Sequence, residues 1–398
     1  MTPKPPTSAP QHPTPPSTVA AILTPLGQGG IGILHVAGPR AFELLAQVFR
    51  PRSNAAIEPD AGKLLYGHIV DGVDVVDEVL VRLVPAEEAG GGEPIVEVNC
   101  HGGHVAVQRV LECFTKRGAV AVEPEAFVER QARSTIESEA VNALQHAATP
   151  LGVEVLLDQL NGALERALGE LPWERPGDAA AALRALLATE RFGRALWQPR
   201  RVAIVGPVNA GKSSLFNALA REDRMIVSPA PGTTRDAVSA LVALGGLPIL
   251  LTDTAGERTP GSVIEEEAIA RARAAAAEAD LALLVLDGSA PTPHSAFRTP
   301  HSLAALNKAD LGLAPWTRDV SDAAVVSATR GDGLDELASR IVAALVGQAR
   351  HEPGRPVVFT ERQAGLLAEA LRGIEAGRSR EARRRIEAAI GPDLYDPA

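Results

Sequence analysis

One stretch of the sequence combines glycines, a lysine and a serine at a spacing that can hold phosphate. Residues 206–213 read GPVNAGKS, fit the pattern G-x-x-x-x-G-K-[ST], and lie between the apolar run RVAIV and the helical run SSLFNALA. Glycines let backbone N–H groups surround phosphate, while a lysine supplies a point charge and a serine hydroxyl can bind Mg²⁺. Alone, the match could be a chance loop. As a hypothesis, the residues that contact a nucleotide here are Asn209, Ala210, Gly211, Lys212, Ser213 and Ser214, with Ser213 also binding Mg²⁺.

Two further segments could contact the γ-phosphate and its metal. DTAG, residues 253–256, ends the apolar run PILLT, so Asp253 can hold Mg²⁺ through water and the Gly256 N–H can meet the phosphate. PAPGTTRD, residues 229–236, lies between the two motifs, and we assign Thr233 to nucleotide contact and Thr234 to Mg²⁺ as a switch-loop threonine. The alternatives are a strand-end turn for DTAG and an ordinary Pro-Gly turn for PGTT.

Two later motifs could read the base. NKAD, which supplies Asn307, Lys308 and Asp310, follows the run SLAAL, and Ser327 and Ala328 follow AAVV. A carboxylate at Asp310 can accept from guanine N1–H and from the exocyclic amine, a pattern that adenine lacks, so it selects GTP and disfavours an ATPase. Taken singly, Asn307 could cap a turn and Ser327 could cap a helix. Four motifs in this order, each after a predicted strand, indicate a GTP-binding G domain.

The composition narrows the remaining function classes. The net charge is −10 over 398 residues, which argues against a protein that binds nucleic acid through its overall charge. Any contact with nucleic acid would need a local basic patch. Two cysteines, Cys100 and Cys113, cannot build a disulfide framework and suit a reducing cytoplasm. CHGGH, residues 100–104, could suggest a metal site, but a strand-to-helix turn explains it without an ion. No apolar run approaches a membrane span, so we expect a cytoplasmic protein with no membrane partner.

The elements that must position these residues fall into several domains. Residues 1–17 are rich in proline and are predicted to be disordered, and residues 18–123 alternate short β-rich runs with helices, as in an α+β domain. Residues 124–199 and 348–398 carry apolar residues at helical spacing. Between them, residues 200–347 alternate apolar runs and helices, which predicts an α/β G domain with a mostly parallel sheet, inserted in the helical part.

The combination of motifs resembles one known family. GPVNAGKSSLFNAL, PGTTRD, DTAG before an acidic helix, and NKAD are similar to the tRNA modification GTPases called MnmE or TrmE. TVAAILTPLGQGGIGILHVAGPRA and VEVNCHGGHVAVQRVL resemble that family's opening and HGG segments. The resemblance covers nearly the whole chain after residue 17.

This resemblance implies a mechanism and partners. Members hydrolyse GTP with a K⁺ ion held partly by the asparagine at position 209, and a glutamate that falls on Glu265 positions the attacking water. Glu265 could instead belong to a solvated helix start, and Glu257 is a competing candidate. The family also implies a homodimer, a formyl-tetrahydrofolate in the amino-terminal domain, and an MnmG-type flavoprotein partner. Together the two proteins modify carbon 5 of the wobble uridine in tRNA.

Two departures from the family pattern keep a second function open. Gln28 stands where the opening loop usually has arginine, and the sequence ends EAAIGPDLYDPA without a Cys-x-Gly-Lys motif. The chain is thus expected to be a divergent member. The alternative function is a regulatory GTPase derived from the family that has lost the modification chemistry.

Overall fold

A computed structural model describes residues 17–25, 27, 29–53, 63–89, 92–221, 226, 238–253, 274–290, 302–320, 322–347 and 352–391. The chain divides into two compact units, Met1–Asn142 with Gly391–Ala398, and Ala143–Ile390. The first unit extends past residue 123 because Phe127 is buried against the sheet residues Val19, Ala21 and Ala37. Within the described part of the chain, no helix is both long and apolar enough to cross a membrane.

The first unit is built on a seven-stranded sheet in the order β3-β4-β5-β6-β2-β1-β7. Its strand pairs are antiparallel except for the parallel pair of β1 with β7. The strands are β1 (Val19–Ile22), β2 (Ile31–Ala37), β3 (Phe49–Pro51), β4 (Leu64–Asp71), β5 (Asp74–Val84), β6 (Ile95–His101) and β7 (Val120–Ala121). The helices are α1 (Ala41–Val48), α2 (His104–Thr115), α3 (Pro124–Gln131) and α4 (Thr135–Leu144). The elements up to β7 have the α+β composition predicted for residues 18–123, whereas α3 and α4 lie in the segment predicted for the helical part.

Alternation along the strands gives this sheet a buried face that α1 and α2 pack against. In β6, Val96, Val98 and Cys100 point into the core, while the residues between them are partly exposed. Both cysteines are buried and free. Burial raises the pKa of the Cys100 thiol to about 11, and also raises the pKa of Cys113. Thiols in this state are poorly reactive.

The two amino-terminal segments that carry the family resemblance lie against each other. Gly102 donates its backbone N–H to the Gly30 carbonyl at 3.4 Å, and a Cβ on Gly102 would lie 2.3 Å from the Gly29 carbonyl oxygen. Next to this contact, the His101 ring nitrogen lies 2.6 Å from Asp77, and this carboxylate raises the pKa of His101. Gln28 lies outside the described residues.

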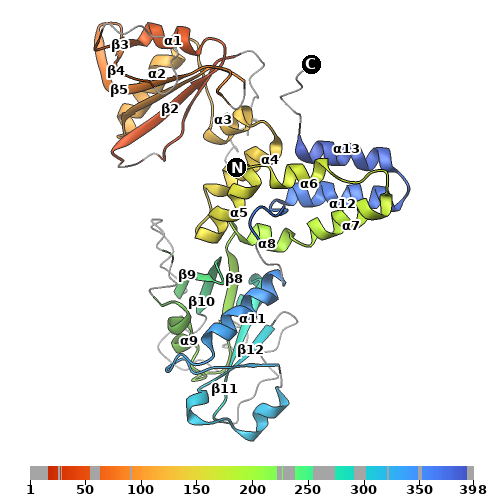
Figure 1. The fold of residues 1–398 in the computed structure, drawn as a ribbon. Helices are drawn as coiled ribbons and strands as arrows, with labels where there is room; N and C mark the ends of the chain where they lie inside the picture. The colour runs from red at the N-terminus through yellow and green to blue at the C-terminus, as the bar shows by residue number, and fades with distance from the viewer. Residues whose placement is uncertain are drawn as a thin grey trace, which may run out of the picture. The chain divides into compact units, whose positions relative to one another are not determined.

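The second unit contains helices on both sides of the G-domain segment. These are α5 (Pro150–Leu160), α6 (Ala163–Gly169), α7 (Pro176–Leu187) and α8 (Glu190–Ala195) before it, and α12 (Glu361–Glu375) and α13 (Ser379–Ile390) after it. Proline at the first helical position starts α5 and α7, and a Thr360–Gln363 capping box starts α12. α12 packs against α7 and α13, so helices from both ends of the segment lie together (Figure 1).

The G domain has a six-stranded sheet in the order β13-β12-β11-β8-β10-β9. Its strands are β8 (Arg200–Val205), β9 (Val238–Leu244), β10 (Leu247–Asp253), β11 (Leu281–Asp287), β12 (Ser302–Asn307) and β13 (Ala324–Val325). Every pair is parallel except the β9–β10 hairpin, whose turn is Gly245–Gly246. The prediction of a mostly parallel sheet is therefore confirmed.

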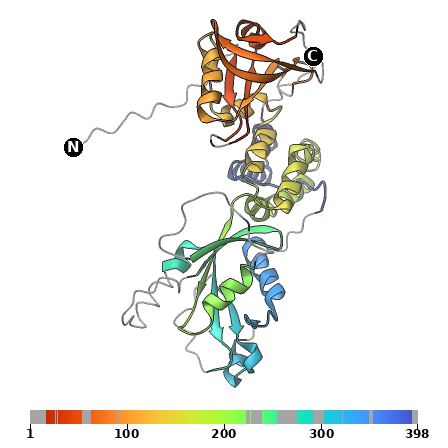
Figure 2. The same cartoon turned by 90° about the vertical axis from the view of Figure 1, so that its left-hand side faces the viewer.

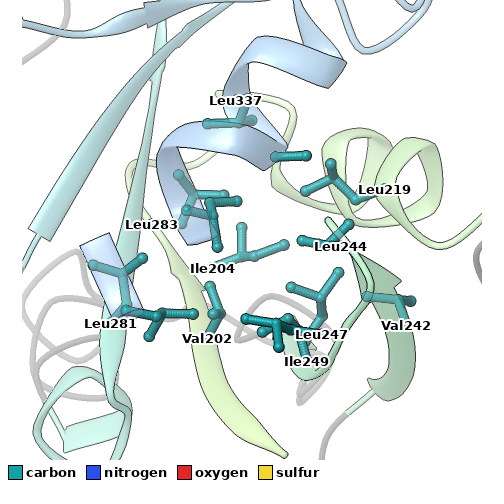
Figure 3. Packing of buried hydrophobic residues seen from close by; sticks show 14 of the residues in the cluster. Val202, Ile204, Leu219, Val242, Leu244, Leu247, Ile249, Leu281, Leu283 and Leu337 are labelled. Atoms are coloured by element: carbon teal, nitrogen blue, oxygen red, sulfur yellow. The ribbon is translucent and has the colours of Figure 1, made fainter. Parts of the chain in front are cut away.

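Elements cover both faces of this sheet because the central strands are apolar on both sides. Helices α9 (Lys212–Leu219) and α11 (Leu334–Val346) share one core with Val202, Ile204 and Leu283 (Figure 3). Figure 2 shows these helices, green and blue, on one side of the sheet. On the other face, Val205, Leu284 and Leu306 pack with residues near the short helix η3 (Pro315–Asp319).

Candidate nucleotide site

The parallel strands bring the predicted motifs to one edge of the sheet. Asp253 at the end of β10 is in register with Ile204 of β8, and Asp287 at the end of β11 is in register with Asn307 of β12. The loop from 206 to 211 leaves β8 at the same edge. In open parallel sheets, ligands bind outside the carboxyl ends of the strands, so this edge is the candidate site.

The phosphate loop has the backbone conformation that anion binding requires. Asn209 and Gly211 have φ angles of 63° and 88°, and Gly211 precedes the first residue of α9. No side chain caps this helix start, so its N–H groups face the loop. The Lys212 ammonium donates to the carbonyls of Gly206 and Pro207 at 2.9 and 2.7 Å, which places the charge inside the curve of the loop.

A buried asparagine joins the phosphate loop to the base-reading loops. The Asn307 Nδ2 donates to the Ala210 carbonyl at 3.1 Å, and its Oδ1 accepts from the Ala328 N–H at 3.0 Å. The residue is 2% exposed, so losing one of these bonds would leave a buried polar atom without that partner. Asn307 therefore does more than cap a turn, because it fixes three motifs in one arrangement.

Asp310 is presented to solvent by a serine from the last motif. The Ser327 hydroxyl donates to Asp310 Oδ1 at 2.6 Å, and this bond holds the pKa of the Asp310 carboxyl below its usual range. Ser327 does not cap α11, whose N-cap residue is Gly333. An ionised, oriented and exposed carboxylate is suited to accept the two guanine N–H donors.

The residues predicted to bind Mg²⁺ offer oxygen ligands where the structure describes them. Asp253 is buried at the end of β10, and Ser213 is exposed in the first turn of α9. Hydroxyl and carboxylate oxygens are the ligands that Mg²⁺ prefers, so these residues fit the ion. Four of the predicted site residues, Thr233, Thr234, Gly256 and Glu265, lie outside the described residues, as does Glu257.

One glycine of the loop provides a sharp test of this arrangement. A Cβ on Gly211 would lie 2.3 Å from Asn307 Nδ2, whereas Gly377, between α12 and α13, has a φ of 72° and nothing within 4 Å of its Cβ position. We expect Gly211→Ala to weaken GDP binding at least about tenfold, because both the loop and Asn307 must shift. Gly377→Ala also places a Cβ on a residue of positive φ, without the clash and away from the loops of the site, and should leave GDP binding within about twofold. Equal GDP affinities of the two variants in a fluorescence titration would show that the contact is unimportant.

Known proteins match both parts of the chain. The family profile described as GTP-binding protein TrmE N-terminus matches residues 18–133, and the profile described as 50S ribosome-binding GTPase matches residues 201–312. The tRNA modification GTPase MnmE of Moorella thermoacetica is 34% identical over 90% of this chain and 90% of its own length. The protein of the same name from Roseiflexus sp. is 35% identical over 95% of this chain and 91% of its own length. The chain belongs to the MnmE family.

Membership of the MnmE family confirms the resemblance found in the sequence. It also confirms the prediction of a GTPase, since the family consists of GTPases and the G-domain motifs lie together as binding requires. Among solved structures, the G domain of the T. maritima FeoB iron transporter is 27% identical and covers 37% of this chain and 99% of its own, with a TM-score of 0.28. This low score adds nothing to the assignment.

Sequence reasoning missed one charged residue at the site edge. Asp287 ends the apolar run LALLVLD, just as Asp253 ends LPILLTD and Asn307 ends SLAALN. Its carboxylate accepts from the Lys308 ammonium at 2.6 Å. The sequence pattern that could have identified Asp287 is a polar residue at the end of a buried parallel strand. Asp287 belongs to none of the G-domain motifs predicted above.

Proposed function

We propose that this protein is a GTP-hydrolysing component of tRNA wobble-uridine modification that works with Mg²⁺ and K⁺. The observation that carries the proposal is the joining of phosphate loop and base-reading loops by the buried Asn307, in a chain that matches MnmE relatives along nearly its whole length. The first feature supports binding of an intact guanine nucleotide. The similarity to MnmE relatives supports the tRNA step, because those relatives are named tRNA modification GTPases.

Within this proposal, the residues of the phosphate loop hold the cations. Ser213 and Asp253 supply oxygen atoms for Mg²⁺, directly or through water, together with Thr234. Asn209 contributes its side-chain oxygen to K⁺: it is exposed, and its positive φ is one that asparagine tolerates well. Bound cations offset negative charge on the phosphates as it develops.

We expect GTP hydrolysis to be at least about fivefold faster in KCl than in NaCl at equal ionic strength, because the ion contributes electrostatic stabilisation at a fixed position. Asn209→Gly keeps the positive φ and removes the ligand, so its rates in the two salts should converge. The measurement is phosphate release under single-turnover conditions. Equal rates for the unmodified protein in the two salts would refute the role of K⁺.

Glu265 is the proposed water-positioning residue. Glu265→Ala should slow GTP hydrolysis by roughly 10²-fold with little change in GTP affinity, because such a group acts mainly in the transition state. Glu257→Ala is the matched control, since it removes another carboxylate that follows DTAG in the sequence. If Glu257→Ala is slow and Glu265→Ala is not, the assignment to Glu265 fails.

In the amino-terminal unit, we place a formyl-tetrahydrofolate site beside the paired opening and HGG segments. Support comes from their direct contact through Gly102 and from the match of residues 18–133 to the TrmE N-terminal family. The proposal includes a homodimer and an MnmG-type flavoprotein, which would supply the redox chemistry of the modification.

Mass analysis of wobble nucleosides tests the modification step. Cells that lack this protein should accumulate uridine without the carbon 5 group, and the wild-type gene should restore it while the Lys212→Ala gene should not. Unchanged nucleosides in the deleted cells, with normal GTP hydrolysis by the purified protein, would instead favour the regulatory GTPase.

A further inference from the structure

The lysine of the NKAD motif is held in an unusual position beside the phosphate loop. Lys308 has a φ of 64°, in the left-handed region that a lysine rarely adopts. Its Cε lies 4.0 Å from the position of a Cβ on Gly211, so its methylene stem runs along the turn of the phosphate loop. The stem therefore lies next to the loop that is predicted to take phosphate.

An aspartate fixes the far end of this stem. The Lys308 ammonium donates to Asp287 Oδ2 at 2.6 Å, while Asp287 Oδ1 accepts from the N–H and hydroxyl of Ser289 at 3.0 and 2.6 Å. The Asp287 side chain is 18% exposed and that of Lys308 is 31% exposed. The pair is thus partly shielded from water, where a charge-assisted bond is stronger than on an open surface.

Backbone hydrogen bonds connect the segments that carry Asp287 and Lys308. Gly288 donates its N–H to the Asn307 carbonyl at 2.8 Å, and the Ala309 N–H donates to the Val326 carbonyl at 3.1 Å. Asp287 and Lys308 are therefore presented from neighbouring strand ends at a fixed separation. Partial burial tends to raise the pKa of Asp287, but hydrogen bonds from Lys308 and Ser289 outweigh it and keep the pKa below its usual range.

We propose that Asp287 is a positioning residue for guanine nucleotides: it fixes the Lys308 ammonium at the end of β11, so that the methylene stem forms one wall of the space for the base. A stem fixed in this way offers an apolar surface to the flat face of a purine. Asp287 acts through Lys308 and does not itself touch the nucleotide. The proposal rests on guanine nucleotide binding at this edge of the sheet.

An Asp287→Asn variant should weaken GDP binding about tenfold, because the ammonium loses its charged partner and can leave its place. The double variant Lys308→Met with Asp287→Asn keeps the stem and removes both charges. Its affinity should be at least about threefold higher than that of Asp287→Asn, since removing both partners of a pair costs less than removing one.

Two controls separate this role from a structural one. Ser289→Ala removes a bond to Asp287 but keeps the ion pair, so GDP affinity should change less than about twofold. Asp319→Asn removes an exposed carboxylate from the nearby helix η3 and should have no effect. The readouts are the Kd of a fluorescent GDP and the melting temperature of each full-length variant.

The double variant tests whether Asp287 acts through Lys308 even if Asp287→Asn alone folds poorly. If the double variant binds GDP as weakly as Asp287→Asn, or if Asp287→Asn binds like the wild type, Asp287 does not act through Lys308 and the proposal is wrong. A wild-type protein that fails to bind GDP would instead refute the GTPase assignment itself.

Discussion

Replacing Lys212 with alanine is expected to reduce the affinity for GDP and GTP by about 10²-fold or more, the loss for an ammonium that meets two phosphates. The charge already lies inside the phosphate loop, bound to the Gly206 and Pro207 carbonyls. A nucleotide phosphate would replace these neutral acceptors with charged ones. No other lysine among the described residues of the G domain bonds to this loop.

The control for this experiment is Lys116→Ala in the other compact unit. Lys116 forms an exposed pair with Asp71, a kind of pair that contributes little to stability. Its removal should leave nucleotide affinity unchanged. If Lys212→Ala still binds GDP tightly in equilibrium titration, the loop does not hold the phosphates.

Replacing Asp310 with asparagine should reverse the choice of base. The carboxylate accepts two N–H donors of guanine, whereas an amide offers one donor and one acceptor, which suits xanthine. We expect GDP affinity to fall by about 10²-fold and xanthosine diphosphate to become the preferred ligand, since sites built on hydrogen bonds reject analogues strongly. Competition between the two diphosphates on the variant measures the effect.

The control variant for Asp310→Asn is Ser327→Ala, which acts on the hydrogen bond between Ser327 and Asp310. Ser327→Ala removes the donor that orients the carboxylate at 2.6 Å but keeps the carboxylate itself. It should weaken GDP binding without any gain for xanthosine diphosphate. Unchanged guanine preference in Asp310→Asn would mean that NKAD does not read the base.

The arrangement of the G domain was predictable because its strands are nearly all apolar. Runs such as RVAIV and PILLT can be buried on both faces, and each is followed by a motif residue at the carboxyl end. Strand β9 was not predicted. Its sequence VSALVAL is only partly alternating, although the Gly245–Gly246 pair that follows it is a hairpin signal.

The candidate site was predictable in its residues but not in their contacts. Lys212, Asn307 and Asp310 could be assigned because each type matches a chemical need at a known spacing. That Asn307 bonds to both Ala210 and Ala328, and that Asp287 holds Lys308, depends on side chains from strands far apart in sequence. Such contacts depend on the order and register of the strands in the sheet, and these cannot be derived from the spacing of the motifs along the sequence.

The most direct test is competition for the site on the full-length protein. A fluorescent GDP bound to the purified chain should be displaced by GTP at a concentration at least about 10²-fold lower than by ATP, because only guanine offers two donors to Asp310. This result would establish that the phosphate loop and the base-reading loops act as one guanine nucleotide site. Displacement by ATP and GTP at equal concentrations would contradict it.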